Sequence, residues 1–201
     1  MIGPESKNPV KFKPFFTVSF FLFWFFFYSI FSSGMPPNGD PVNYFLLARN
    51  IVLHGSFGME RSEVVPLDEG PDGAFYSKFG LGQSLLEVPF YAAANAIVPG
   101  RDAEPYPYAF HYFVASLSVP FVCALLCAAF LFLCVERGYP RRVCMAATAV
   151  LGLATMVWPY SKTGFSEPLQ AALLCGAVLY AFRSAKNASA ALSAGALAGL
   201  L

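Results

Sequence analysis

The longest apolar run in this sequence, residues 110–135, contains no Asp, Glu, Lys or Arg and ends at Glu136 and Arg137. At a rise of about 1.5 Å per residue, roughly 20 apolar residues cross the hydrocarbon core of a bilayer, so this run can span a membrane with some tilt. In the whole chain of 201 residues, 57% are hydrophobic and 12% are charged, a balance outside that of soluble globular domains. The sequence therefore predicts an all-α membrane protein and argues against a soluble cytosolic domain.

Further apolar runs predict a multi-pass transmembrane helix bundle. The expected spans are residues 15–33, 110–135, 143–158, 168–182 and 188–201. A cleaved signal peptide is the competing interpretation of the first run, because the SSG sequence at 32–34 weakly resembles a cleavage site. The last run reaches residue 201 inside an Ala/Gly/Leu-rich helix without a cap. We therefore expect residues 1–201 to be the N-terminal part of a larger transmembrane domain.

The distribution of Lys and Arg predicts the orientation of these spans. With a cytoplasmic N-terminus, the inner segments hold eight basic residues against Glu5 and Glu136. These basic residues are Lys7, Lys11, Lys13, Arg137, Arg141, Arg142, Arg183 and Lys186. The positive-inside rule then places the long loop, residues 34–107, on the outer face of a plasma (inner) membrane. The net charge of +1 leaves no basic excess for a nucleic-acid partner.

Two amphipathic stretches of this loop predict helices. Residues 42–53 place Phe45 and Ala48 on an apolar face, with Asn43 away from it. Residues 81–98 could be mistaken for a span, but Glu87 would then lie unpaired in lipid. We expect this second segment to form an interfacial helix that lies on the bilayer surface.

Asp40 is the first candidate for chemistry, because it follows the first span closely in the NGDP sequence. The alternative is an ordinary turn in which Asp40 caps a helix that has proline at its first position.

Lys78 is the second candidate, as a lone cation among aromatic and glycine residues in YSKFGLGQ. An ammonium at the membrane surface suits a lipid-linked phosphate. It could equally extend its charged end to water or pair with a phospholipid headgroup.

Glu167 is the third candidate, because an acidic residue at a membrane boundary is a default functional suspect. It can also be a plain helix-start residue, with Ser166 as the cap. The five cysteines all sit in apolar runs without His or carboxylate at metal-ligand spacing, and we assign them no chemistry.

Together, GDPVNYFLLARNIVLHGSF after the first span, YSKFGLGQSLLEVPFY and TGFSEPLQ resemble the N-terminal part of GT-C superfamily polytopic glycosyltransferases. The similarity is to bacterial relatives of the protein mannosyltransferases and of the lipid A aminoarabinose transferases. The resemblance implies that Asp40 is a catalytic residue, as the base or as a metal-linked acid. It also implies that Lys78 with Tyr76 binds the donor phosphate and that Glu167 is a possible second acid. Family members often carry an adjacent acid where this chain has Pro41, which puts a divalent cation in doubt.

The reaction implied by the resemblance is transfer of a sugar from a polyprenyl-phosphate donor to an acceptor hydroxyl on the outer face of the membrane. The expected partners are membrane lipid, the lipid-linked sugar donor, and a glycan, lipid or protein acceptor. A transporter fragment is one rival, although the predicted spans hold few ionisable groups beyond His111. A non-catalytic membrane scaffold is the other.

Overall fold

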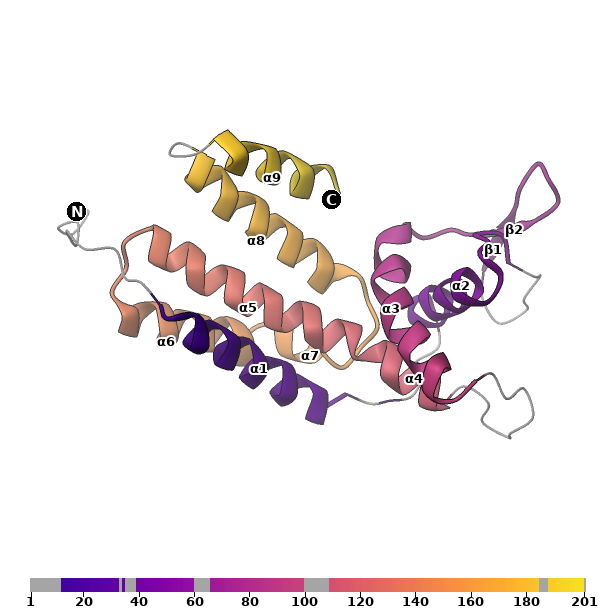
Figure 1. Cartoon of the computed structure of the whole chain (residues 1–201), viewed down its shortest axis with the longest axis horizontal. Helices are drawn as coiled ribbons and strands as arrows, with labels where there is room; N and C mark the ends of the chain where they lie inside the picture. The colour runs from indigo at the N-terminus through magenta and orange to yellow at the C-terminus, as the bar shows by residue number, and fades with distance from the viewer. Residues whose placement is uncertain are drawn as a thin grey trace. The chain divides into compact units, whose positions relative to one another are not determined.

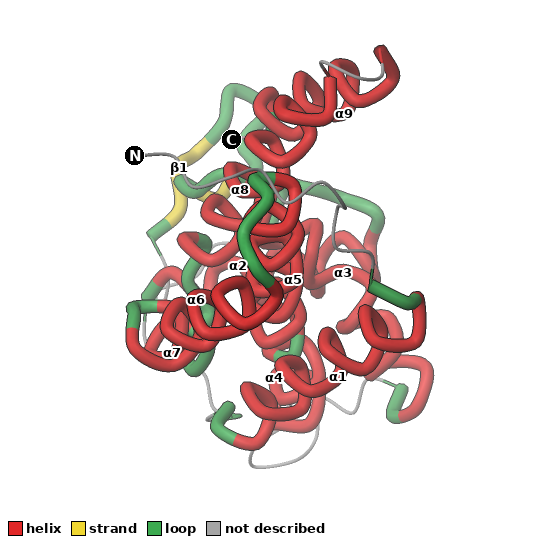
Figure 2. Tube along the Cα trace, turned by 90° about the vertical axis from the view of Figure 1, so that its left-hand side faces the viewer, coloured by secondary structure: helices red, strands yellow, loops and turns green. Residues whose placement is uncertain are grey.

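The computed structural model describes residues 12–32, 34, 39–59, 66–99, 109–184 and 188–200, most of which are helical (Figures 1 and 2). The helices are α1 Pro14–Ile30, α2 Asp40–His54, α3 Leu81–Ile97, α4 Ala109–Ser116, α5 Ser118–Glu136, α6 Arg141–Ala154, α7 Val157–Tyr160, α8 Glu167–Ser184 and α9 Ala188–Gly199. Strands β1 Leu67–Glu69 and β2 Phe75–Ser77 form an antiparallel hairpin. The prediction of a mostly helical chain is confirmed.

The chain folds as two compact units. The first contains α1, α6 to α9 and nearly all of α5, and the second contains α2 to α4, the hairpin and residues 162–166. The second unit therefore corresponds to most of the predicted outer loop, which forms packed structure of its own.

Close packing of α1 against α6 builds the core of the first unit. Phe20, Trp24 and Tyr28 are buried at four-residue intervals along one face of α1. The Tyr28 hydroxyl donates a hydrogen bond of 3.0 Å to the carbonyl oxygen of Gly152. A Cβ at Gly152 would stand 2.5 Å from the Trp24 ring, so the absence of a side chain permits this approach.

Basic side chains gather at one end of the first unit. The Arg141 guanidinium lies 4.8 Å from the centroid of the Phe16 ring, which joins the start of α6 to the start of α1. Arg183 Nε lies 3.6 Å from Glu136 Oε2, which joins the end of α8 to the end of α5. We call Arg137, Arg141 and Arg183 the basic end. Because α1 and α6 start here while α5 and α8 finish here, the two pairs of helices run in opposite directions.

The predicted spans agree only in part with the helices. Among the described residues, the continuous helical segment Ala109–Glu136 is the one long and apolar enough to cross a membrane, whereas Pro14–Ile30 and Ser189–Gly199 are shorter apolar helices. The expectation of one helix over 143–158 is wrong, because α6 ends at Ala154. Thr155 adopts an extended conformation there, and Pro159 has no N–H to donate to its carbonyl.

The second unit packs around aromatic side chains from three helices. Phe45 of α2 lies 5.5 Å from the Tyr91 ring of α3 and 5.2 Å from the Tyr112 ring of α4, centroid to centroid. Ala115 completes this buried cluster. The helices expected over 42–53 and 81–98 are therefore present as α2 and α3.

Polar residues of α3 face inward and apolar residues face outward at its first turns. Gln83 and Glu87 are buried, whereas Leu81 and Leu85 are 45% and 48% exposed. Such an apolar outer face suits a helix at a bilayer surface, and the interfacial location stays a prediction.

Candidate functional site

Asp40 is the first residue of α2. Gly39 precedes it as the N-cap residue, and no side-chain hydrogen bond caps the helix. The interpretation of Asp40 as the capping residue is therefore wrong. Its carboxylate lies in the first helical turn, where the exposed N–H groups and the helix dipole favour negative charge.

Asn43 lies one turn after Asp40 on the same side of α2 and is fully buried. The prediction that Asn43 lies away from the packed face is wrong. Its Nδ2 donates a hydrogen bond of 3.3 Å to the carbonyl oxygen of Pro66, just before β1. Its buried Oδ1 has no hydrogen-bond partner among the described residues. This long-range contact could not be read from helical spacing.

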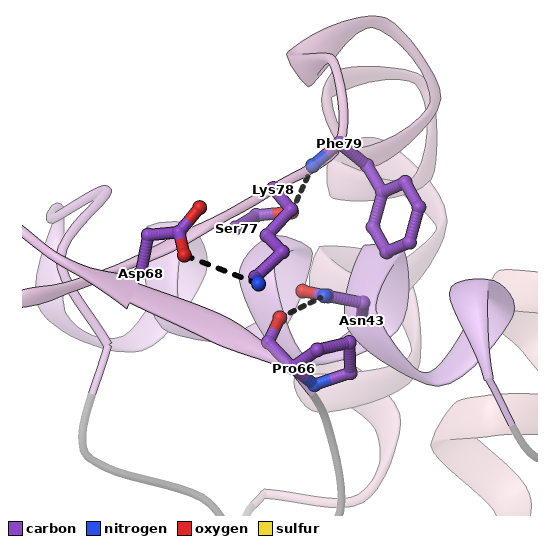
Figure 3. Close-up of polar contacts among 6 residues, drawn as sticks. All are labelled: Asn43, Pro66, Asp68, Ser77, Lys78 and Phe79. Atoms are coloured by element: carbon purple, nitrogen blue, oxygen red, sulfur yellow. Dashed lines mark hydrogen bonds and ion pairs between the residues drawn. The ribbon is translucent and has the colours of Figure 1, made fainter.

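Lys78 follows β2, and its ammonium is held by the neighbouring strand. Lys78 Nζ lies 3.2 Å from Asp68 Oδ1, and both side chains are substantially exposed. Ser77 Oγ accepts a hydrogen bond from the Phe79 N–H, which turns the chain toward α3. Figure 3 shows Lys78 and Asn43 side chains extending toward the segment that contains Pro66 and Asp68.

Tyr76 has a carboxylate partner of its own. Its hydroxyl donates a hydrogen bond of 2.6 Å to Asp72 Oδ2 in the hairpin turn. This bond lowers the pKa of Asp72 and raises the pKa of Tyr76. Tyr76 pairs directly with Asp68 across the hairpin, and residues two apart on a strand share a face. Tyr76, Lys78 and Asp68 therefore belong to one face of the hairpin.

The fold of the second unit thus brings the start of α2 close to the Lys78 hairpin. The contact of Asn43 with Pro66, together with a ring contact of 5.7 Å between Tyr44 and Phe79, fixes the first turns of α2 beside both strands. Asp40 lies one helical turn before Asn43, and helix residues at this spacing have Cβ atoms about 5–6 Å apart.

The connection before Glu167 also lies at the start of α2. A Cβ at Gly164 would stand 2.6 Å from the Cβ of Pro41, so this part of residues 162–166 packs directly on the second residue of α2. Glu167 is the first residue of α8, which belongs to the first unit and starts at the end opposite to the basic end. Its convergence with Asp40 stays a prediction.

The sequence did not predict that a buried acid and a buried imidazole lie on two helices that pack together. Glu87 of α3 and His111 of α4 are 4% and 3% exposed. Gln83 Nε2 donates a hydrogen bond of 3.0 Å to Glu87 Oε1. Burial raises the pKa of Glu87 to about 8 even though the Gln83 hydrogen bond acts in the opposite direction. The signal available in the sequence was an acid inside an otherwise apolar helix.

The described residues around Asp40 form no metal-binding cluster. Asp40 is followed by Pro41, and no group of three or more His, Cys, Asp or Glu side chains is placed to hold a metal within the described parts of the chain.

Comparison with protein-family models, curated proteins and solved structures finds no match to this chain.

Proposed function

We propose that this chain is part of a membrane-embedded glycosyltransferase that moves a sugar from a polyprenyl-phosphate donor to an acceptor hydroxyl on the outer face of the membrane. The observation that carries the proposal is the placement, within one compact unit, of the Asp40 end of α2 beside the hairpin that bears Lys78. Sugar transfer needs both groups, a base for the acceptor and a cation for the leaving phosphate.

Asp40 would serve as the base. The acceptor hydroxyl must lose its proton as its oxygen attacks the anomeric carbon, and a positioned carboxylate can take that proton. Asp40 is only half-buried, so an acceptor arriving from water can reach its carboxylate.

Lys78 would stabilise the lipid phosphate that leaves. Its present partner, Asp68, is exposed, and exposed ion pairs contribute only about 0–1 kcal/mol. A phosphate group with more negative charge can therefore replace the Asp68 carboxylate. Phosphate oxygens of the lipid-linked sugar would then accept hydrogen bonds from the ammonium in place of the Asp68 carboxylate oxygen.

Two features of the first unit support a membrane location. The face of α1 that is turned away from its packed stripe exposes large apolar side chains, including Phe15 at 83% and Ile30 at 78%. The basic end gathers side chains that the positive-inside rule assigns to the cytoplasmic side. A bilayer satisfies both, because it covers the apolar face and leaves the charged end in water.

Loss of the base should abolish transfer. In the full-length protein in its native membranes, Asp40→Asn should reduce transfer from a decaprenyl-phosphate-linked sugar by about 10²- to 10⁴-fold, the usual contribution of a general base. Expression and helix content should stay unchanged. Glu69→Gln is the matched control, because it removes an exposed acid of the same unit. Unchanged transfer by Asp40→Asn would favour the scaffold alternative.

Changes at Lys78 and Asp68 should move donor binding in opposite directions. Lys78→Ala should weaken binding of decaprenyl phosphate by about 10- to 100-fold, since a hydrogen bond to a charged group contributes about 1.5–3 kcal/mol. Asp68→Asn should strengthen binding, because it removes the carboxylate that competes for the ammonium. Equal affinities for the wild type and both variants, measured by native mass spectrometry, would remove Lys78 from the site.

A further inference from the structure

The contact between α3 and α4 buries ionisable and polar side chains that the proposed transfer reaction does not use. Glu87 comes from α3 and His111 from α4, and both are more than nine-tenths buried. The two helices pack directly against each other. The Tyr91 ring, one turn after Glu87, lies 5.3 Å from the His111 ring, centroid to centroid. Ionisable side chains that are fully buried are uncommon and are candidates for functional sites.

Glu87 is placed to hold a proton. Its one hydrogen bond among the described residues comes from the Gln83 amide, and no described cation forms an ion pair with it. An amide donor can serve either the carboxylate or the carbonyl oxygen of the neutral acid. Burial favours the neutral acid, which agrees with a pKa near 8.

His111 and Ser84 have buried polar atoms that need a partner. Neither ring nitrogen of His111 and no oxygen of the Ser84 side chain forms a hydrogen bond within the described part of the chain. Buried polar atoms of this kind are normally satisfied by ordered water. A neutral imidazole offers one donor and one acceptor, so water can bridge from it to a carboxyl group.

The groups around Glu87 come from two helices packed on α3, namely α2 and α4. The titratable or charged side chains of these helices are Asp40, Tyr44, Arg49 and His54 on α2 and His111 and Tyr112 on α4. Tyr112 lies within electrostatic range of Glu87. Burial and the Gln83 hydrogen bond are the influences that act on the Glu87 carboxyl itself.

We propose that Glu87 and His111 form a buried proton-binding site at the α3–α4 contact, in which water joins the carboxyl to the imidazole. A hydronium ion from solvent gives its proton to the Glu87 carboxylate and becomes water, and in the reverse step the neutral carboxyl group gives the proton back to water. No electrons are transferred. The site is independent of Asp40 and Lys78, so it stands or falls separately from sugar transfer.

Infrared titration of the full chain in lipid nanodiscs tests this site. The C=O stretch of a protonated carboxyl group should persist at pH 7, where exposed acids are ionised, and should disappear with a midpoint near pH 8. Glu87→Gln should remove this band while keeping an oxygen that accepts from Gln83, so the fold is retained. Glu69→Gln should leave the band unchanged.

Three results would overturn the site. A carboxyl band that disappears entirely below pH 6 would show that Glu87 does not hold a proton at neutral pH. A neutral-pH band that survives in a folded Glu87→Gln variant would belong to another residue. A midpoint that does not move in His111→Gln, which retains a polar side chain, would remove His111 from the site. A shift of the midpoint by about half a pH unit or more would support the pair.

Discussion

Glu87 couples the stability of the second unit to pH. Its pKa is about 8 in the folded chain against an ordinary value of 4.5, so between these values the folded state holds a proton that the unfolded state has lost. The contribution of Glu87 to the free energy of unfolding should therefore be largest below pH 4.5. Between pH 4.5 and pH 8 it should fall by up to about 1.4 kcal/mol per pH unit, and above pH 8 it should stay constant.

Thermal unfolding in detergent, followed by circular dichroism between pH 5 and pH 8, measures this effect. As the pH rises over this range, the melting temperature of the wild type should fall further than that of Glu87→Gln, whose side chain at position 87 cannot ionise. Parallel curves for the two proteins would mean that Glu87 has an ordinary pKa in both states.

Helical spacing alone predicts the burial of some residues correctly and of others wrongly. The spacing correctly placed Phe45 and Ala48 on the packed side of α2. It failed for Asn43, because the partner that makes burial of an amide tolerable is a carbonyl of Pro66, distant in sequence. For Glu87, the sequence predicted an unpaired acid in lipid if residues 81–98 crossed the membrane, and therefore favoured a helix on the bilayer surface. The fold instead buries that acid beside Gln83.

At the scale of elements, the approach of α6 to α1 depends on Gly152. Gly152→Ala should destabilise the first unit by about 1–3 kcal/mol, because the added methyl group would overlap the rigid ring of Trp24, which is 3% exposed. The helix preference for alanine, about 1 kcal/mol, offsets only part of this cost.

A second glycine supplies the control for this experiment. Gly195 lies inside α9, and a Cβ there meets no atom within 4 Å. Gly195→Ala should therefore keep or raise the melting temperature, whereas Gly152→Ala should lower it. If both variants melt like the wild type, α6 does not pack on α1 through Gly152.

Hydropathy located helices better than it located their interruptions. Runs at 15–33, 110–135 and 168–182 correspond to α1, to α4 with α5, and to α8. The break at Thr155 was missed because hydropathy registers neither the missing N–H of Pro159 nor the hydrogen bonds of the Thr155 side chain. The Thr155 hydroxyl donates to the Leu151 carbonyl and accepts from the Val157 N–H. The β1–β2 hairpin was not predicted from the sequence either.

At the scale of the whole molecule, the orientation of the chain in a membrane can be tested directly. Reporter enzymes fused after Gly73 and after Arg142 should report opposite compartments, outside for the first and cytoplasm for the second, because the positive-inside rule predicts a cytoplasmic location for the basic end. Both fusion sites lie outside the long apolar helical segment Ala109–Glu136. The same compartment for both fusions would contradict the proposed topology.

Charge counting and chain direction agree at this scale. The count grouped Arg137, Arg141 and Arg183 on one side of a membrane, and their contacts gather them at one end of the first unit. The candidate site was less predictable. Sequence supplied Asp40 and Lys78, but the Asp68 partner of Lys78 depends on the hairpin register.

The early end of α6 has a consequence for the membrane in which we propose that it lies. Its 14 residues extend for about 21 Å, whereas the hydrocarbon layer is about 30 Å thick. A membrane that houses α6 must therefore become locally thinner or admit water to the depth of Thr155. In the membrane location that we propose, the acyl-chain length of the host lipids should therefore affect this protein. Shorter lipids match α6 without deformation, and longer ones must compress around it.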